Sequence, residues 1–257
     1  MRDRIRISVA EVLRPSPDVL AGWEGGSAAF GSVDAYSDID LSFLVTDAAS
    51  LDALYAISEK ALREISPISA SHDAPPGRYY KLRDAGDFLL LDLCFFRVSD
   101  SDYQLDVDRH GQAVPLFDKA DWLHASDTSD PAKATARQHR YAELQGWFLI
   151  SQGFVRKELL RGRSADAIAA FWGYTLRPLA ELLRMRYCPA RWDFGMRYLD
   201  RDLPPSVHAR FCELLFVRDL KDLEYRFAAA QSWGTELLNE LALSEWTSNS
   251  SEPKNSG

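Results

Sequence analysis

Residues 25–43 of the chain read GGSAAFGSVDAYSDIDLSF. Two carboxylates in this stretch, Asp38 and Asp40, lie two residues apart where an apolar strand begins. Because successive side chains of a strand point to opposite faces, both carboxylates are expected on one face, about 7 Å apart. Neighbouring anions repel each other unless a cation lies between them, and carboxylate oxygens are ligands that Mg²⁺ prefers. The pair predicts a divalent-metal site. The alternative for two such acids alone is an exposed turn in which they cap backbone groups.

The glycines that precede this pair predict a site for an anion. Gly26, followed by Ser27, and Gly31 allow tight backbone turns. Backbone N–H groups in such turns can approach a phosphate closely. The aspartate pair is therefore suited to bind a cation, and the glycine turns are suited to bind an anion.

This arrangement resembles the nucleotidyltransferase superfamily that includes DNA polymerase beta, and within it the small-molecule antibiotic nucleotidyltransferases. The family pattern is Gly-Ser, a glycine five residues after the first, and Asp-hydrophobic-Asp about a dozen residues after it. The chain fits this pattern without a gap, through Gly26, Ser27, Gly31, Asp38, Ile39 and Asp40. It departs from the usual small-molecule members at Ala28, where they have arginine. The departure weakens a phosphate contact at that position and leaves the metal site untouched.

The resemblance also implies a third carboxylate on a later strand. Asp92 lies inside the apolar segment LLLDLCF, residues 89–95, where an unpaired carboxylate would cost several kcal/mol by desolvation. A bound metal offsets such a cost, so Asp92 is the expected third ligand. Asp87, at the entrance of the strand, is the weaker substitute.

The resemblance implies nucleotidyl transfer as the reaction. A substrate hydroxyl attacks the α-phosphorus of ATP or another nucleoside triphosphate, with two Mg²⁺ ions present, and pyrophosphate leaves. Asp38 and Asp40 would bridge the metals. Asp92 would complete the metal that activates the hydroxyl and could take its proton, while Ser27 would hold the β- and γ-phosphates. Glu143 and Glu158 remain alternative general bases.

Periodicity predicts an α+β protein with two structural parts. Residues 1–130 are expected to form an α/β nucleotidyltransferase domain, residues 131–243 a helical substrate-binding domain, and residues 244–257 a disordered tail. Expected strands are residues 40–45, 78–82 and 88–96, and a helix capped by Ser50 is expected up to residue 65. Expected helical segments of the second part are residues 132–151, 165–187 with a kink at Pro178, and 206–243.

Composition and charge limit the kind of partner. The chain of 257 residues has a net charge of −8, which divides into −11 for residues 1–132, +6 for residues 133–226 and −3 for residues 227–257. An acidic first part argues against binding long nucleic acid and suits a divalent metal or a cationic substrate. The longest apolar run is too short to span a bilayer, and no secretory signal is present, so a cytoplasmic protein is expected. Three distant cysteines indicate reduced thiols.

Two segments of the second part are weaker candidates for substrate binding. Lys157 belongs to a basic cluster that could reach the triphosphate, although a solvated helix face is the alternative. The loop from Arg191 to Tyr198 could stack on a base or sugar, although an aromatic plug between helices is the commoner outcome.

The leading hypothesis is a Mg²⁺-dependent adenylyltransferase that modifies a hydroxyl of a small molecule, with modification of an aminoglycoside-like antibiotic as the analogy. The second is an enzyme that transfers AMP to a protein, or an antitoxin-like partner. The third is a non-catalytic nucleotide-binding module. The acceptor, the preferred nucleotide and the oligomeric state remain open.

Overall fold

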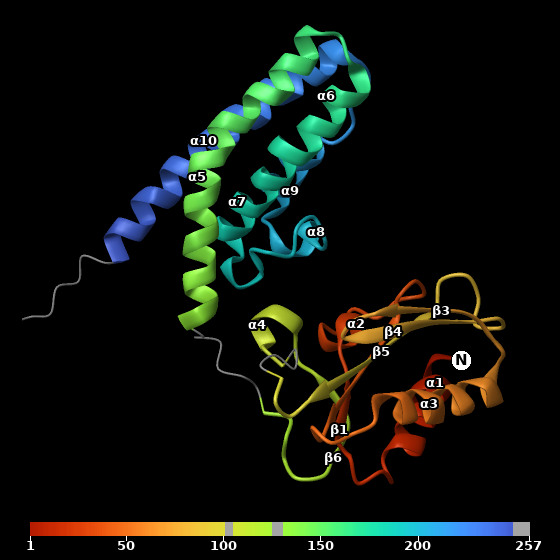
Figure 1. Cartoon of the computed structure of the whole chain (residues 1–257). Coiled ribbons are helices and arrows are strands. Elements are labelled where there is room, and N and C mark those ends of the chain that lie inside the picture. Colours follow the sequence, from red (N-terminus) through yellow and green to blue (C-terminus); the bar gives the residue numbers. More distant parts are fainter. Residues whose placement is uncertain (101–104, 125–130, 249–257) are drawn as a thin grey trace, which may run out of the picture. The chain divides into compact units, whose positions relative to one another are not determined.

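The computed structural model describes residues 1–100, 105–124 and 131–248 (Figure 1). The chain divides into two compact units, Met1–Thr128 and Ser129–Gly257. The first is a mixed sheet with helices and the second is helical, which confirms the predicted α+β class. The predicted boundary at residue 130 lies outside the described residues.

A six-stranded mixed sheet forms the first unit, in the order β3-β4-β5-β2-β1-β6. The central strands β2 and β5 run parallel, and all other neighbours are antiparallel. The predicted strands at residues 40–45, 78–82 and 88–96 are confirmed as β2, β4 and β5. The six strands are β1 (Val19–Glu24), β2 (Ile39–Val45), β3 (Ile68–Ala74), β4 (Gly77–Leu82), β5 (Leu90–Arg97) and β6 (Val114–Asp118).

Two helices, α1 (Arg2–Leu13) and α3 (Leu51–Ile65), pack side by side on one face of this sheet (Figure 1). The Ser50 side chain accepts a hydrogen bond from Ala53 N–H at 3.4 Å, so the predicted cap of α3 is confirmed. Apolar side chains of both helices are buried with those of the strands beneath them, and burial of apolar area is the main stabilising contribution here. Short helices α2 (Gly26–Ala29) and α4 (Val107–His110) complete the unit.

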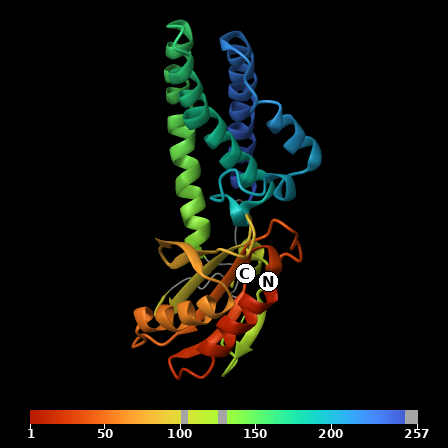
Figure 2. The ribbon, with the colours of Figure 1, turned by 90° about the vertical axis from the view of Figure 1, so that its right-hand side faces the viewer.

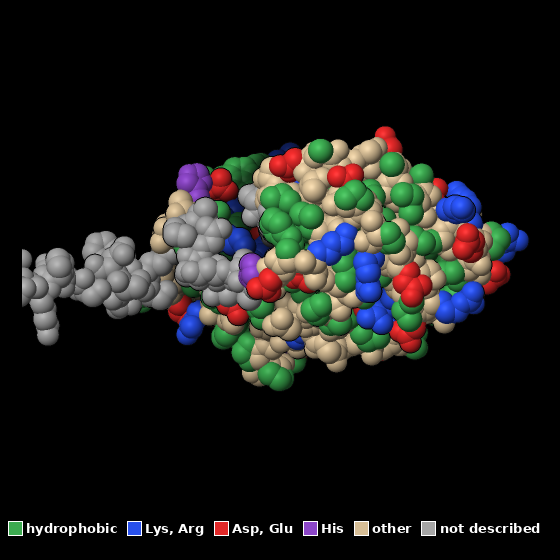
Figure 3. Space-filling model, turned by 90° about the horizontal axis from the view of Figure 1, so that it is seen from below, with side chains coloured by type: hydrophobic (Ala, Val, Ile, Leu, Met, Phe, Trp, Pro, Cys, Tyr) green, Lys and Arg blue, Asp and Glu red, His purple; other side chains and the backbone are tan. Residues whose placement is uncertain are grey.

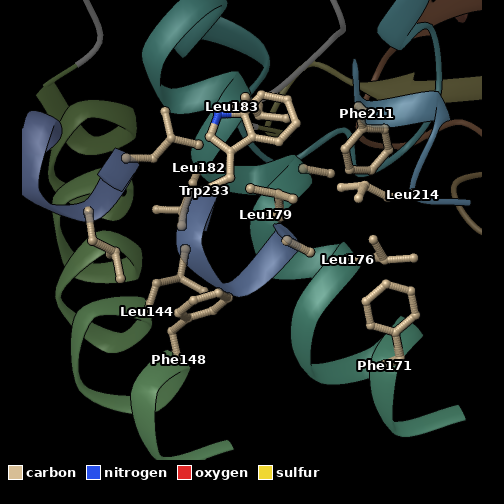
Figure 4. Close-up of a cluster of buried hydrophobic side chains, with 14 of the residues drawn as sticks. Leu144, Phe148, Phe171, Leu176, Leu179, Leu182, Leu183, Phe211, Leu214 and Trp233 are labelled. Atoms are coloured by element: carbon tan, nitrogen blue, oxygen red, sulfur yellow. The ribbon is translucent and has the colours of Figure 1, made fainter. Parts of the chain in front are cut away.

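Long helices build the second unit around a buried apolar cluster (Figure 4). Leu144 and Phe148 contribute to it from α5, and Trp233 from α10. The helical elements are α5 (Pro131–Leu160), α6 (Ser164–Phe171), the π-helical turn η1 (Trp172–Leu176), α7 (Arg177–Tyr187), the 3₁₀ turn η2 (Pro189–Arg191), α8 (Leu199–Asp202), α9 (Pro205–Cys212) and α10 (Leu220–Ser248). None of the helices in the described part of the chain has a stretch long and apolar enough to cross a membrane.

The helical segment around Pro178 contains a π-helical turn, which has a physical cause. Proline lacks an N–H, so the Tyr174 carbonyl four residues earlier loses its usual helical donor. The buried Gln152 amide on α5 donates to that carbonyl at 2.9 Å. Gln152 also accepts a hydrogen bond from the Thr175 hydroxyl at 2.6 Å. A side chain from a neighbouring helix thus satisfies what the proline leaves unpaired, and the predicted kink takes the form of η1.

Three details of the helical prediction are wrong. Helix α5 continues to Leu160, past the predicted end at residue 151, because no proline interrupts residues 152–160. Residues 206–243 are not one helical segment, because α9 ends at Cys212 and α10 begins at Leu220. Asp219 accepts a hydrogen bond from Asp222 N–H at 2.8 Å, which starts a new helix at this point. The last helix also continues to Ser248, past the predicted end at residue 243, because no proline or glycine interrupts residues 244–248. The rest of the predicted tail, residues 249–257, lies outside the described residues.

A buried arginine holds the loop between α7 and α8. Arg184 is fully buried and its guanidinium lies 2.6 Å from the Asp202 carboxylate. It also donates to the carbonyls of Gly195, Arg191 and Arg197. Burial opposes ionisation of Asp202, but hydrogen bonds from Arg184 and Arg201 and the charge of Arg191 lower its pKa. Each buried charge of this pair therefore has an oppositely charged partner inside the unit.

Arg184→Met is expected to lower the free energy of unfolding by about 3 kcal/mol, because it removes the fully buried partner of the Asp202 carboxylate and the donor to three loop carbonyls. The matched control is Arg186→Met on the same helix, where the side chain is 51% exposed and a change below about 0.5 kcal/mol is expected. Urea unfolding followed by tryptophan fluorescence measures both. Equal losses in the two variants would show that the Arg184 network contributes nothing specific.

Candidate active site

Asp40 and Asp92 lie beside each other at the centre of the sheet. They are register partners on the parallel strands β2 and β5. Their neighbours Leu41 and Leu93 are buried in the cluster under α1 and α3. Because side chains alternate along a strand, both carboxylates lie on the face opposite these helices. The structure thus brings together the two acids that the sequence placed on different strands.

Burial and nearby negative charge both perturb the pKa of Asp40. Burial, the charge of Asp92 and the charge of Asp38 raise this pKa to about 6, while Arg2 opposes the shift. The charges of the other two predicted aspartates therefore both act on Asp40. A cation at this position would favour the charged form of each.

Arg2 fixes the chain segment that enters β2. Its guanidinium donates to the carbonyl oxygens of Ser37 and Asp38 at 3.1 and 2.8 Å. It also contacts the buried Glu24 carboxylate at 2.5 Å, and Arg6 contacts the other oxygen of Glu24 at 2.5 Å. These contacts of Arg2 and Arg6 with Glu24 were not predicted from the sequence. The available signal was the spacing of the two arginines, which is one turn of a helix and places both on one helix face.

Gly26 packs directly against the Asp40 carboxylate. Its φ is +53°, and a Cβ built on it would lie 1.7 Å from Asp40 Oδ2. The preceding Gly25 N–H donates to the Asp40 carbonyl at 2.9 Å. Only glycine fits at position 26, because a side chain would need both the left-handed conformation and the space that the carboxylate fills.

Ser27 presents a buried hydroxyl to the same region. Its Oγ has no hydrogen-bond partner among the described residues. Buried polar atoms are nearly always satisfied, so this hydroxyl is available to a bound group. A phosphate contact at Ser27 stays a prediction. Gly31 follows with φ +63°, and its N–H donates to the Ala28 carbonyl at 3.0 Å. Gly31 therefore closes the turn after α2.

Tyr79 is a neighbour of the aspartates that the sequence analysis missed. It is the register partner of Asp92 on β4. Burial, the charge of Asp92 and a hydrogen bond to that carboxylate raise the pKa of Tyr79 to about 12. Cys94 Sγ lies 3.6 Å from Asp92 Oδ1, and burial raises its pKa first, followed by the Asp92 charge. Both groups stay neutral near pH 7 and add no charge to the site.

Asp87, the predicted substitute for Asp92, is an exposed residue before β5. Its carbonyl accepts a hydrogen bond from Lys81 Nζ at 3.4 Å. It is not among the groups that shift the pKa of Asp40, whereas Asp92 is. The structure therefore favours Asp92 as the third carboxylate.

The remaining candidates lie in the second unit, so their approach to the aspartates stays a prediction. Lys157 Nζ lies over the Phe154 ring, 5.3 Å from its centroid. Glu143 contacts Arg140 at 3.0 Å and Glu158 contacts Arg161 at 2.8 Å, so each of these alternative bases already has a cationic partner.

The loop from Arg191 to Tyr198 is held to its own unit. Arg184 binds three of its carbonyls, and Trp192 and Met196 pack against the apolar cluster. These contacts match the alternative of an aromatic plug between helices. Substrate stacking on this loop stays a prediction.

The donor set at the aspartates fits a hard divalent cation, since it consists of carboxylate oxygens only. As the side chains stand, no group of three or more His, Cys, Asp or Glu residues within the described residues is arranged to hold a metal ion. Uncompensated carboxylates repel one another, and Asp40 shows that repulsion in its pKa. Metal binding would therefore require the carboxylates to turn toward a shared ion.

No protein-family model matches the chain, and no curated protein matches it at a significant level. Solved structures with a similar arrangement include an aminoglycoside 6-adenyltransferase from Bacillus subtilis, with 12% identity, a TM-score of 0.36, and coverage of 96% of this chain and 97% of that chain. Another is the STING-associated CdnE c-di-GMP synthase from Capnocytophaga granulosa, with 15% identity, a TM-score of 0.32, and coverage of 90% and 80%.

A third similar structure is the CdnE cyclic dinucleotide synthase from Elizabethkingia meningoseptica, with 14% identity, a TM-score of 0.30, and coverage of 92% and 89%. Likeness at such TM-scores does not decide the reaction of this chain, which is inferred below from its own residues.

Proposed function

We propose that the protein is a Mg²⁺-dependent nucleotidyltransferase that moves an adenylyl group from ATP to a hydroxyl of a small molecule and releases pyrophosphate. The observation that carries this proposal is the adjacency of Asp40 and Asp92 on the face of the sheet opposite α1 and α3, with Gly26 against Asp40 and with Asp38 acting on its charge. Three interacting carboxylates beside a tight glycine turn suit a metal-bound triphosphate.

The side chains take separate parts in this reaction. Asp38, Asp40 and Asp92 would hold Mg²⁺, which supplies charge stabilisation for the entering and leaving oxygens. The Ser27 hydroxyl donates to a phosphate oxygen of the triphosphate. Asp92 accepts the proton of the acceptor hydroxyl as its oxygen bonds to the α-phosphorus and the bond to pyrophosphate breaks. Tyr79 donates to Asp92 and thereby orients the carboxylate.

The proposed acceptor is a small, cationic, hydroxyl-bearing molecule of the aminoglycoside type. The net charge of −11 over residues 1–132 favours a cationic molecule over a polyanion. On the face shown in Figure 3, acidic and basic side chains are interspersed and no continuous basic surface is present among the atoms shown in colour. Neither observation selects one acceptor.

The test is pyrophosphate release by the full-length protein with Mg²⁺, ATP and a panel of aminoglycosides and other polyols. Asp38→Asn and Asp40→Asn serve as inactive controls. Turnover that is equal in these variants would rule out the site. A mass increase of one AMP on a co-expressed protein, with no small-molecule product, would favour protein modification. Triphosphate binding without pyrophosphate release on any acceptor would favour a binding module.

Ser27→Ala is expected to raise KM for ATP about tenfold and to leave kcat within about threefold. A hydrogen bond to a charged phosphate contributes about 1.5–3 kcal/mol, and the variant removes the unpaired buried donor. The matched control is Ser32→Ala, whose hydroxyl is exposed and donates to the Ser27 carbonyl at 3.3 Å. Steady-state kinetics measure KM and kcat for both variants. An equal change in KM for ATP in the two variants would contradict a phosphate contact at Ser27.

A further inference from the structure

Helix α5 has one buried face and one exposed apolar face. Leu144, Phe148 and Val155 are buried in the core of the second unit. Trp147, Ile150 and Phe154 point away from it, with exposures of 47%, 63% and 38%. Figure 2 shows α5 as a long helix at one side of its unit. Contiguous exposed apolar side chains of this size mark an interaction surface.

The exposed residues form one continuous stripe along α5. Each helical residue turns by about 100°, so seven residues fall within about 60° of Ile150 on the helix circumference. We call these residues the α5 front face: Glu143, Gly146, Trp147, Ile150, Gly153, Phe154 and Lys157. All seven are exposed.

Two glycines on the front face have no explanation within one copy of the chain. Gly146 and Gly153 lie in the interior of α5, where glycine costs about 1 kcal/mol relative to alanine. A Cβ on either would meet no atom within 4 Å. Small side chains let two helices approach each other closely, which accounts for glycine at both positions if another helix packs here.

We propose that the α5 front face is the interface of a homodimer, in which two copies of α5 pack antiparallel about a two-fold axis at Ile150. The order of residues on the face supports a second copy as the occupant. Glu143 and Lys157 lie seven residues on either side of Ile150, so the reversed helix brings each opposite its counter-charge on the partner. A parallel pair would place like charges together.

The same axis pairs the other residues of the face. On one side of the contact, Gly146 lies beside the partner's Gly153, where the two backbones can approach. On the other side, Trp147 lies beside the partner's Phe154, and the aromatic cluster extends to Tyr174, whose ring is 6.4 Å from Trp147 and 5.5 Å from Phe154 in the same copy. Aromatic residues are enriched in protein interfaces. About this one axis, the glycines of one copy thus face glycines of the other, aromatic residues face aromatic residues, and each charge faces its opposite.

Pairing with Glu143 of the partner gives Lys157 a role that differs from phosphate binding. Within one copy, Lys157 lies over the Phe154 ring and Glu143 contacts Arg140 and, at 3.9 Å, His139. Neither contact removes these side chains from solvent. The dimer does not depend on the proposed reaction, so each proposal can fail without the other.

The solution mass of the full chain tests the interface. The wild type is expected at about 58 kDa, twice the 29.0 kDa of one copy, by analytical ultracentrifugation at micromolar concentration. Ile150→Asp places two carboxylates at the axis and is expected to raise the dimer dissociation constant at least about 100-fold. The matched control is Phe216→Asp, which replaces an exposed apolar side chain elsewhere in the unit and should leave the dimer intact. A monomeric wild type, or a dimer that Ile150→Asp leaves intact, would overturn the proposal.

Charge reversal tests the register of the two helices. Glu143→Lys and Lys157→Glu should each weaken the dimer about tenfold, because each creates two like-charge contacts. The double variant restores opposite charges and should return the dissociation constant to within about threefold of the wild type. Additive weakening in the double variant would exclude this register.

A cysteine at the axis gives an independent readout. Ile150→Cys should form a disulfide-linked dimer with a mild oxidant such as diamide, because the two thiols meet at the axis. Gln145→Cys, also exposed on α5 but off the front face, is the matched control and should remain a single chain on a non-reducing gel. Equal cross-linking of both variants would contradict the predicted contact.

Discussion

Asp40→Asn is expected to lower nucleotidyl transfer at least about 1,000-fold and, at the same time, to stabilise the metal-free protein above pH 6. The loss of activity follows because the amide cannot replace a carboxylate that holds the metal. The gain in stability follows because the substitution removes a buried charge that Asp92 and Asp38 repel. Opposite effects on activity and stability distinguish a functional charge cluster from a structural one.

The pH dependence of this gain has a definite sign. Folding raises the Asp40 pKa from 3.8 to about 6, so the folded protein binds the proton more tightly than the unfolded chain. The stabilising contribution of this group is complete below about pH 4 and is lost as the pH rises to about 6, by about 3 kcal/mol in total. The Asn variant does not lose this stability, because its amide does not ionise. Its advantage over the wild type in urea unfolding, measured in EDTA, should therefore appear between pH 4 and 6.

Asp38→Asn is the matched control for stability. Asp38 contributes to the shift at Asp40 after burial and Asp92, so its substitution should stabilise the metal-free protein by a smaller amount. An Asp40→Asn protein that is less stable than the wild type at pH 7.5 in EDTA would contradict the charge cluster.

Gly26→Ala is expected to abolish activity, with at least about a 100-fold loss, while Gly25→Ala keeps activity within a few-fold of the wild type. An added Cβ at position 26 would overlap the Asp40 carboxylate and would require φ +53° of a residue with a side chain. At position 25 the φ is −103° and the added Cβ meets no atom within 4 Å.

The same kinetic assay with ATP and Mg²⁺ measures both glycine variants, and circular dichroism checks that each is folded. If the two variants lose activity equally, the close contact between Gly26 and Asp40 has no catalytic consequence.

Local patterns predicted the elements that carry the candidate site. The Asp-Ile-Asp strand and the strand around Asp92 follow from apolar runs with alternation, and α3 follows from its periodicity and the Ser50 cap. Their parallel pairing, with Asp40 and Asp92 as register partners, could not be read locally, because the pairing depends on which distant strands meet.

Elements without a strong local pattern escaped prediction. Strand β3 is exposed along most of its length and shows no alternation, as expected for an edge strand. Helix α1 carries Arg2, Arg4 and Arg6, which obscure the spacing of its buried Ile5 and Val9. Tyr79 escaped because only the register of β4 on β5 places it beside Asp92. The first two errors thus come from weak local patterns, and the third concerns a contact between segments that are distant in the sequence.

The central claim is that Asp38, Asp40 and Asp92 bind divalent metal together. Titration of the full-length protein with Mn²⁺, followed by the electron paramagnetic resonance signal of the free ion at pH 7.5 in the presence of ATP, measures it directly. The wild type and Asp87→Asn should bind Mn²⁺ equally, whereas Asp92→Asn should bind at least about tenfold more weakly. Equal binding by Asp92→Asn and the wild type, or a loss confined to Asp87→Asn, would contradict the account.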